Sequence, residues 1–123
     1  VRAAEGASLP FWTEASGLAA QDLADSYINF PNPFAAGRQS TRFAFQLPGD
    51  GRVSLRIWTA RGDPVATLLD DRGLAAGLHQ DLTWDGRNGR GTAVRNGVYL
   101  AELRVEFANG GSERLLRKVA VVR

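Results

Sequence analysis

The sequence contains no cysteine, a single histidine and no long apolar run. The absence of cysteine leaves the redox compartment open, and a chain of 123 residues buries enough surface to fold without a disulfide or a metal. No run approaches the roughly 20 apolar residues of a membrane span, so none is expected. No signal-peptide pattern is visible either. Because the chain begins at Val1 rather than methionine, we expect a processed product or a fragment.

A concentrated patch of positive charge is also missing. The chain has fourteen arginines, one lysine and thirteen acidic residues, for a net charge of only +2. Nucleic-acid-binding proteins gather their positive charge in a patch. Here the arginines alternate with acidic and apolar residues, as at Arg52, Arg56, Arg104, Arg114 and Arg117. This pattern predicts a solvated sheet face of mixed charge and no nucleic-acid partner.

The sequence also lacks a catalytic constellation. Catalysis needs a nucleophile, a base and an orienting group that converge in a pocket. The only histidine, His79, falls on the outward phase of its expected strand with Asp81 and Thr83, whereas Leu78 falls on the inward phase. We therefore expect neither an enzyme nor a cofactor.

What the sequence does contain is alternation, most clearly over residues 96–107. Apolar residues occupy every second position, and charged residues lie between them: Tyr99, Ala101, Leu103, Val105 and Phe107 on one side, Glu102, Arg104 and Glu106 on the other. A period of two over this length predicts a strand with one face in a core and one in water. The preceding turn, residues 84–91, supplies the glycines and asparagine that positive φ angles favour.

Six further stretches are expected to be strands: residues 27–30, 41–47, 52–59, 65–69, 78–84 and 112–122. A loop is expected at residues 70–77. About seven short strands at this spacing, with no long helix after residue 26, predict an antiparallel β-sandwich over residues 27–123. The expected core consists of Phe43, Phe45, Val53, Leu55, Ile57, Trp84, Tyr99, Leu103, Val105 and Val119.

Residues 1–26 differ from the rest and are expected to form a linker or extension. They are rich in alanine, and a weak helical stripe runs over residues 14–25. The strongly apolar cluster is Leu9, Phe11 and Trp12. These side chains are expected either to cover an edge of the sandwich or to contact a neighbouring copy of the chain.

Several short motifs resemble a known bacterial module, in the module's own order. They are Pro31-Asn32-Pro33-Phe34, Trp84-Asp85-Gly86, Gly97-Val98-Tyr99 and Lys118-Val119. Residues 27–123 resemble the immunoglobulin-like domain of the flagellar hook-capping protein. They are still more similar to the C-terminal sorting domains of the type IX secretion system, whose YPNPF opening and GVY…K(V/M) close they share. Phe30 stands where that opening has tyrosine, and Trp58-Thr59 where the family usually has Tyr-Asp.

The resemblance implies an immunoglobulin-like β-sandwich at the C-terminus of an exported bacterial protein, secreted or at the cell surface. Its partner would be the outer-membrane secretion machinery, and the four motifs would carry recognition. Two alternatives stay open. One is a structural subunit of an extracellular assembly that packs on neighbouring copies through residues 1–26, and the other is a hook-cap domain.

Three short motifs match patterns of known binding sites, but the residues favour an ordinary turn in each case. Arg61-Gly62-Asp63 spells an integrin-binding tripeptide, but glycine and aspartate are ordinary turn residues. Gly86 to Gly91 has the spacing of a phosphate-binding loop without the Lys-Ser/Thr that must follow. Asp85 and Asn88 offer oxygens suited to calcium, but we expect Asp85 to accept amides of its own turn.

Overall fold

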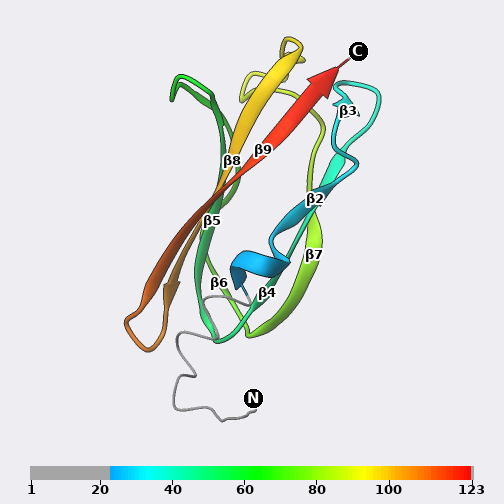
Figure 1. The fold of residues 1–123 in the computed structure, drawn as a ribbon. Coiled ribbons are helices and arrows are strands. Elements are labelled where there is room, and N and C mark those ends of the chain that lie inside the picture. The colour runs from blue at the N-terminus through cyan, green and yellow to red at the C-terminus, as the bar shows by residue number, and fades with distance from the viewer. Residues whose placement is uncertain (1–22, 123) are drawn as a thin grey trace.

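The computed structural model describes residues 23–122, and it shows an antiparallel β-sandwich (Figure 1). One helical turn at residues 23–26 precedes the strands. In chain order the strands are β2 (Ile28–Phe30), β3 (Phe34–Ala35), β4 (Thr41–Leu47), β5 (Gly51–Thr59), β6 (Pro64–Leu74), β7 (Gly77–Trp84), β8 (Gly97–Phe107) and β9 (Ser112–Val122). The expected fold class is confirmed.

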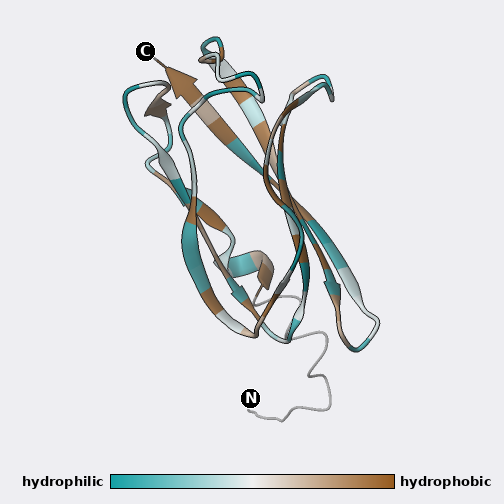
Figure 2. Ribbon diagram, turned by 180° about the vertical axis from the view of Figure 1, so that it is seen from behind, coloured by the Kyte–Doolittle hydropathy of each residue, from teal (hydrophilic) through white to brown (hydrophobic). Residues whose placement is uncertain are grey.

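Two sheets face each other across the core. One has the order β2-β4-β7 and the other the order β3-β9-β8-β5-β6. The chain passes from the first sheet to the second at residues 31–33, because β2 pairs antiparallel with β4 whereas β3 pairs parallel with β9. Figure 2 shows brown and teal segments alternating along the strands, as expected when one side of each strand faces the core. The C-terminal strand and β3 therefore meet at one end of the sandwich (Figure 1).

All ten residues of the expected core are buried. The helical turn and the residue after it add to this core, because Leu23 and Tyr27 are fully buried. The Tyr27 ring packs against Phe43 and Phe45, with ring centroids 6.4 and 6.5 Å away, and its hydroxyl donates to the carbonyl of Ala101. The turn therefore packs on the sandwich.

The loop expected at residues 70–77 is largely wrong. β6 continues to Leu74, and only residues 75 and 76 separate it from β7. Asp71 takes a left-handed φ of 48°, which aspartate tolerates better than most residues, and its amide donates to the Ser54 hydroxyl where the β5–β6 register shifts. A bulge thus lets polar, loop-like residues remain in a strand.

The expected orientation of His79 and Leu78 is wrong for a similar reason. The β4–β7 pairing shifts register, so that Phe43 lies opposite Leu82 but Phe45 lies opposite His79. This shift reverses the phase of the strand before it. His79 therefore turns its ring toward Phe45, with centroids 5.6 Å apart, and Leu78 is exposed.

Glu102 is the third correction, because it is buried rather than in water. It lies on the outer side of β8, where its carboxylate accepts hydrogen bonds from the Trp58 indole and from Nε of Arg114. These two partners come from β5 and β9, so the pattern within β8 gave no sign of them.

Leu9, Phe11 and Trp12 lie outside the described residues, as does most of the expected helix at residues 14–25. The described part of the chain contains no helix long and apolar enough to cross a membrane.

Candidate functional site

Three of the four sequence motifs meet in an aromatic stack near the end of β9. The Phe34 ring packs edge-on against Trp84, with centroids 5.6 Å apart and planes at 63°. Trp84 packs in turn against Tyr99, at 5.8 Å and 71°. All three side chains are buried. Edge-to-face contact suits the ring quadrupoles and adds to the burial of apolar area.

Asn32 joins the first motif directly to the C-terminal strand. Its side-chain amide donates to the carbonyl of Lys118 at 3.0 Å, and its side-chain oxygen accepts the amide of Ala120 at 2.8 Å. One side chain thus satisfies two backbone groups on the edge of β9, as a neighbouring strand would. Further along β9, the same edge pairs with the backbone of β3, with Phe34 opposite Val121 and Ala35 opposite Val122.

The third and fourth motifs lie opposite each other in the β8–β9 ladder. Gly97 pairs with Val121, Val98 with Ala120 and Tyr99 with Val119. The Tyr99 hydroxyl also donates to the carbonyl of Arg95 at 2.7 Å, which fixes the entry into β8. The motif residues are therefore neighbours in space, although they span most of the chain.

The turn after Trp84 supports β3 from the other side. The Trp84 indole donates to the carbonyl of Arg87 at 2.9 Å, and the Asp85 carboxylate accepts the Arg87 amide at 3.0 Å. The Asp85 carbonyl accepts the Gly37 amide at 3.0 Å, which ties this turn to the residues after β3. As expected, the Asp85 carboxylate accepts an amide of its own turn.

The calcium alternative for this turn gains no support from the geometry. The side-chain oxygen of Asn88 accepts the amides of Arg90 and Thr92, so it serves the turn as well. Among residues 23–122, no group of three or more histidine, cysteine, aspartate or glutamate side chains is placed to hold a metal.

Residues outside the predicted set of site residues complete the site. Gln39 accepts the amide of Ala35 through its side chain, and Arg87 donates to the carbonyl of Gly91. Ala36 packs against Gly86 so closely that a Cβ at Gly86 would collide with it. No local signal marks these partners, because each contact joins a loop residue to backbone that local alternation does not describe.

Arg117 joins the middle of β9 to the N-terminal helical turn. Arg117 donates to the carbonyl oxygens of Tyr27 and Ala24, and its guanidinium lies 5.2 Å from the Tyr27 ring centroid. Burial raises the pKa of the Tyr27 hydroxyl well above its ordinary value, although the charge of Arg117 opposes this effect. Tyr27 therefore acts as a neutral hydrogen-bond donor.

The site thus combines a buried framework with a polar and apolar surface. Phe34, Trp84, Gly86, Tyr99 and Val119 are buried, whereas the exposed members are Asn32, Pro33, Asp85, Gly97, Val98 and Lys118. Such an arrangement can present a strand end of fixed shape to another protein. His79 lies on β7, as Trp84 does, but its ring packs against Phe45 rather than against the aromatic stack.

The fold is shared with several solved structures. The latent, dimeric PorU of Porphyromonas gingivalis matches 79% of this chain at 23% identity, with a TM-score of 0.60, and the match spans 9% of the PorU chain. FlgD of P. aeruginosa matches 80% at 18% identity, with a TM-score of 0.56 and 76% of its own chain covered. FlgD of Xanthomonas campestris, whose structure is described as giving insights into the hook capping essential for flagellar assembly, matches 87% of this chain at 22% identity, with a TM-score of 0.53 and 76% of its own chain covered.

At these identities the likenesses show the fold, and the fold agrees with the one that the resemblance implied. No protein-family model matches the sequence, and no curated protein matches it.

Proposed function

We propose that this chain is a non-enzymatic β-sandwich module of an exported bacterial protein, and that it acts as a sorting or surface-attachment domain of the type IX kind. The observation that carries the proposal is the convergence of the sequence motifs on the last strand. Asn32 bridges the edge of β9, β3 pairs with its end, and Phe34, Trp84 and Tyr99 pack together beneath it.

This geometry suits recognition by a partner protein. A C-terminal strand held at its end has a defined shape, and Lys118 and Val122 are exposed on it. Among the described strands, only β3 pairs with the outer edge of β9, and it does so only at Val121 and Val122. Asn32 covers the edge at Lys118 and Ala120, so the part of the edge before Lys118 is suited to the addition of a strand from the secretion machinery.

The shares of the two chains that the PorU match covers also support the interpretation of this chain as a module. Most of this chain corresponds to only 9% of PorU, so the fold occurs as a small part of a much longer protein. A sorting domain at the end of a large cargo has the same proportions.

An export assay tests the proposal. The whole chain is fused to the C-terminus of a reporter that carries an export signal, and the fusion is expressed in a bacterium with type IX secretion. We expect the reporter at the cell surface or in the medium, whereas the reporter without the chain stays in the periplasm. Retention of both in the periplasm would contradict the sorting role.

The hook-cap alternative is favoured by the two FlgD likenesses, which cover most of those solved chains. In a motile strain that lacks its hook-capping protein, FlgD carrying this sandwich in place of its own should restore swimming if that alternative holds. The sorting proposal expects no restoration from a stably expressed exchange protein.

The assembly alternative rests on residues 1–26, and sedimentation tests it. The intact chain is compared with a version that begins at Leu23, because Leu23 is fully buried and belongs to the folded unit. A larger species seen only with the intact chain would support packing through Leu9, Phe11 and Trp12. Monomers in both samples at micromolar concentration would remove the assembly alternative.

A further inference from the structure

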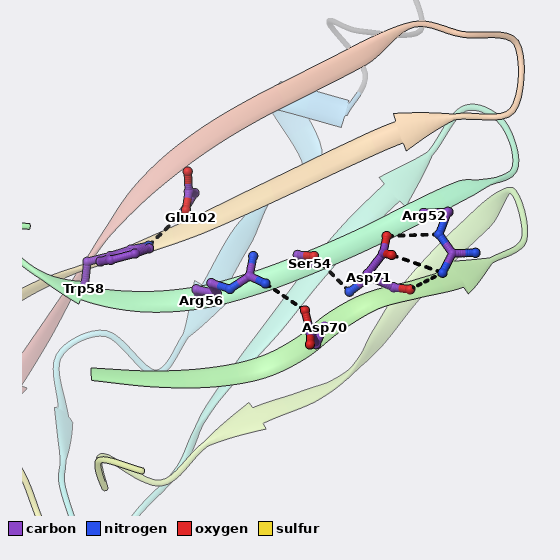
Figure 3. A network of polar contacts seen from close by, with 7 residues as sticks. All are labelled: Arg52, Ser54, Arg56, Trp58, Asp70, Asp71 and Glu102. Carbon is purple, nitrogen blue, oxygen red and sulfur yellow. Dashed lines mark hydrogen bonds and ion pairs between the residues drawn. The ribbon is translucent and has the colours of Figure 1, made fainter. Parts of the chain in front are cut away.

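The outer face of the five-stranded sheet is divided into two halves of different charge. On the β5–β6 half, arginines are paired with acids (Figure 3). Nε of Arg52 lies 3.0 Å from Oδ1 of Asp71, and Nη2 of Arg56 lies 2.7 Å from Oδ1 of Asp70. The hydrogen bond from Arg52 lowers the pKa of the Asp71 carboxyl, so this pair stays ionised at neutral pH. Positive charge on this half is compensated.

The β8–β9 half has an excess of positive charge. Arg104 lies directly opposite Arg114 in the β8–β9 register, and like charges in such positions destabilise a sheet. Two acids share the outer side of β8 with Arg104: Glu102, whose oxygens already accept hydrogen bonds from Trp58 and Arg114, and Glu106, which lies opposite Arg52 in the β5–β8 register. Within residues 23–122, Arg104 forms no ion pair. An anionic group bound beside the two arginines would offset their repulsion.

A groove of about 410 Å³ lies on this cationic half. Its apolar lining comes from Trp58, Leu100 and Leu116, and Leu116 is 39% exposed. Arg104 and Arg114 line it from β8 and β9, and Arg61 lines it from the turn between β5 and β6. The Trp58 indole is held in place by its 2.9 Å hydrogen bond to Glu102 (Figure 3). Tryptophan and arginine side chains in a preformed groove are typical of binding hot spots.

We propose that this groove binds an extended peptide in which an aliphatic or aromatic side chain stands next to a carboxylate. The apolar residue would cover Trp58 and Leu116, and the carboxylate would accept hydrogen bonds from Arg104 and Arg114, which lie opposite each other. The Glu102 carboxylate at the groove disfavours a phosphate backbone, which would bring several charges close to it. This inference is independent of the proposed sorting function, because the groove lies on the outer sheet face rather than around the end of β9.

A titration followed by two-dimensional ¹H–¹⁵N NMR tests the proposal on the whole chain. The probe is a short capped peptide of alternating aspartate and leucine. We expect saturable shifts of the Trp58 indole and of the amides around Leu100 and Leu116, with a Kd below about 1 mM. Capped peptides that alternate serine with leucine, or aspartate with serine, should bind much more weakly, because each lacks half of the recognised chemistry.

Two matched variants test whether peptide binding depends on the charge of Arg104 in the groove. Arg104→Gln should weaken binding about tenfold, since it removes one charge-assisted hydrogen bond. Arg52→Gln removes the same charge from the same sheet face but outside the groove, and it should change the Kd less than about twofold. Leu116→Ser tests the apolar lining and should also weaken binding, and its exposure makes the substitution compatible with folding.

Several results would overturn the proposal. These are the absence of saturable shifts, equal losses in Arg104→Gln and Arg52→Gln, and equal binding of the serine–leucine peptide. Tighter binding of oligothymidylate at the same residues would show that the groove serves nucleic acid instead.

Discussion

Gly86 lies so close to Ala36 that a Cβ built on the glycine would stand 2.4 Å from the Cβ of the alanine. No real Cβ is found at such a distance, and Gly86 also takes a φ of +81°. The contact brings the turn after Trp84 against the residue that follows β3. A motif that looks like an ordinary turn in the sequence is thus the surface on which the partner of the C-terminal strand is packed.

Gly86→Ala should therefore destabilise the fold by about 2–5 kcal/mol, from backbone strain and overpacking together. Gly91→Ala is the matched control, because Gly91 has nearly the same φ of +82° but no atom within 4 Å of a built Cβ. It should cost only about 1–2 kcal/mol. Urea denaturation followed by circular dichroism measures both. Equal losses would mean that the contact with Ala36 is unimportant.

Trp84→Ala should cost about 3–5 kcal/mol, because it removes a buried ring that contacts both Phe34 and Tyr99. Phe30→Ala removes an aromatic ring that is 76% exposed, and it should change stability by less than about 0.5 kcal/mol. Urea midpoints at constant slope give both values. A loss below about 1 kcal/mol for Trp84→Ala would contradict its place at the centre of the stack.

Much of this fold was predictable from local alternation, and the failures have physical causes. Strands β4 and β9 have the predicted bounds, because β4 alternates and is followed by a turn, and β9 begins after the turn at residues 108–110. β6 was cut short at Leu69, because Asp70 and Asp71 look like loop residues until Arg56 and Arg52 are placed beside them. Bulges are equally invisible, since they depend on which residue of the partner strand lies opposite.

The candidate site shows the same limit. The motif residues were named from resemblance, but their contacts join segments up to about 90 residues apart in the chain, such as Asn32 with Lys118 and Ala120. Glu102 looked like a surface residue because alternation reports which side of a strand a side chain occupies. It does not report whether that side is covered.

The Glu102 network predicts a pH dependence of stability. Burial raises the pKa of the Glu102 carboxyl, but hydrogen bonds from Arg114 and Trp58 outweigh this and hold the pKa below its ordinary value of 4.5. A carboxyl with a depressed folded-state pKa stabilises the fold above its unfolded pKa, and this contribution is lost as the pH falls through the folded value.

Glu102→Gln should therefore be less stable than the wild type at pH 7, and the difference should shrink as the pH falls below about 4.5. Glu106→Gln, at an exposed position on the same side of β8, should show little difference at either pH. Thermal or urea unfolding at a series of pH values measures this. A Glu102→Gln difference that stays constant down to pH 2 would contradict the proposed network.

The Asn32 bridge predicts a local effect on β9. In Asn32→Ala, the amide of Ala120 loses its acceptor and should exchange with deuterium faster, while the amide of Leu103 in the core stays protected. Asn109→Ala is the control, because the side-chain oxygen of Asn109 also accepts a backbone amide, that of Gly111 at 2.9 Å, but at the far end of the β8–β9 hairpin. It should leave the exchange of Ala120 unchanged. Unchanged protection in Asn32→Ala would show that the bridge does not hold β9.

The most direct test of the central claim is export of the reporter fusion carrying Lys118→Ala or Asn32→Ala, compared with Asn109→Ala, after all three are shown to be folded. If the held end of β9 is what the secretion machinery recognises, the first two should lose most of their surface display and Asn109→Ala should keep it. Full display of both Lys118→Ala and Asn32→Ala would contradict the claim.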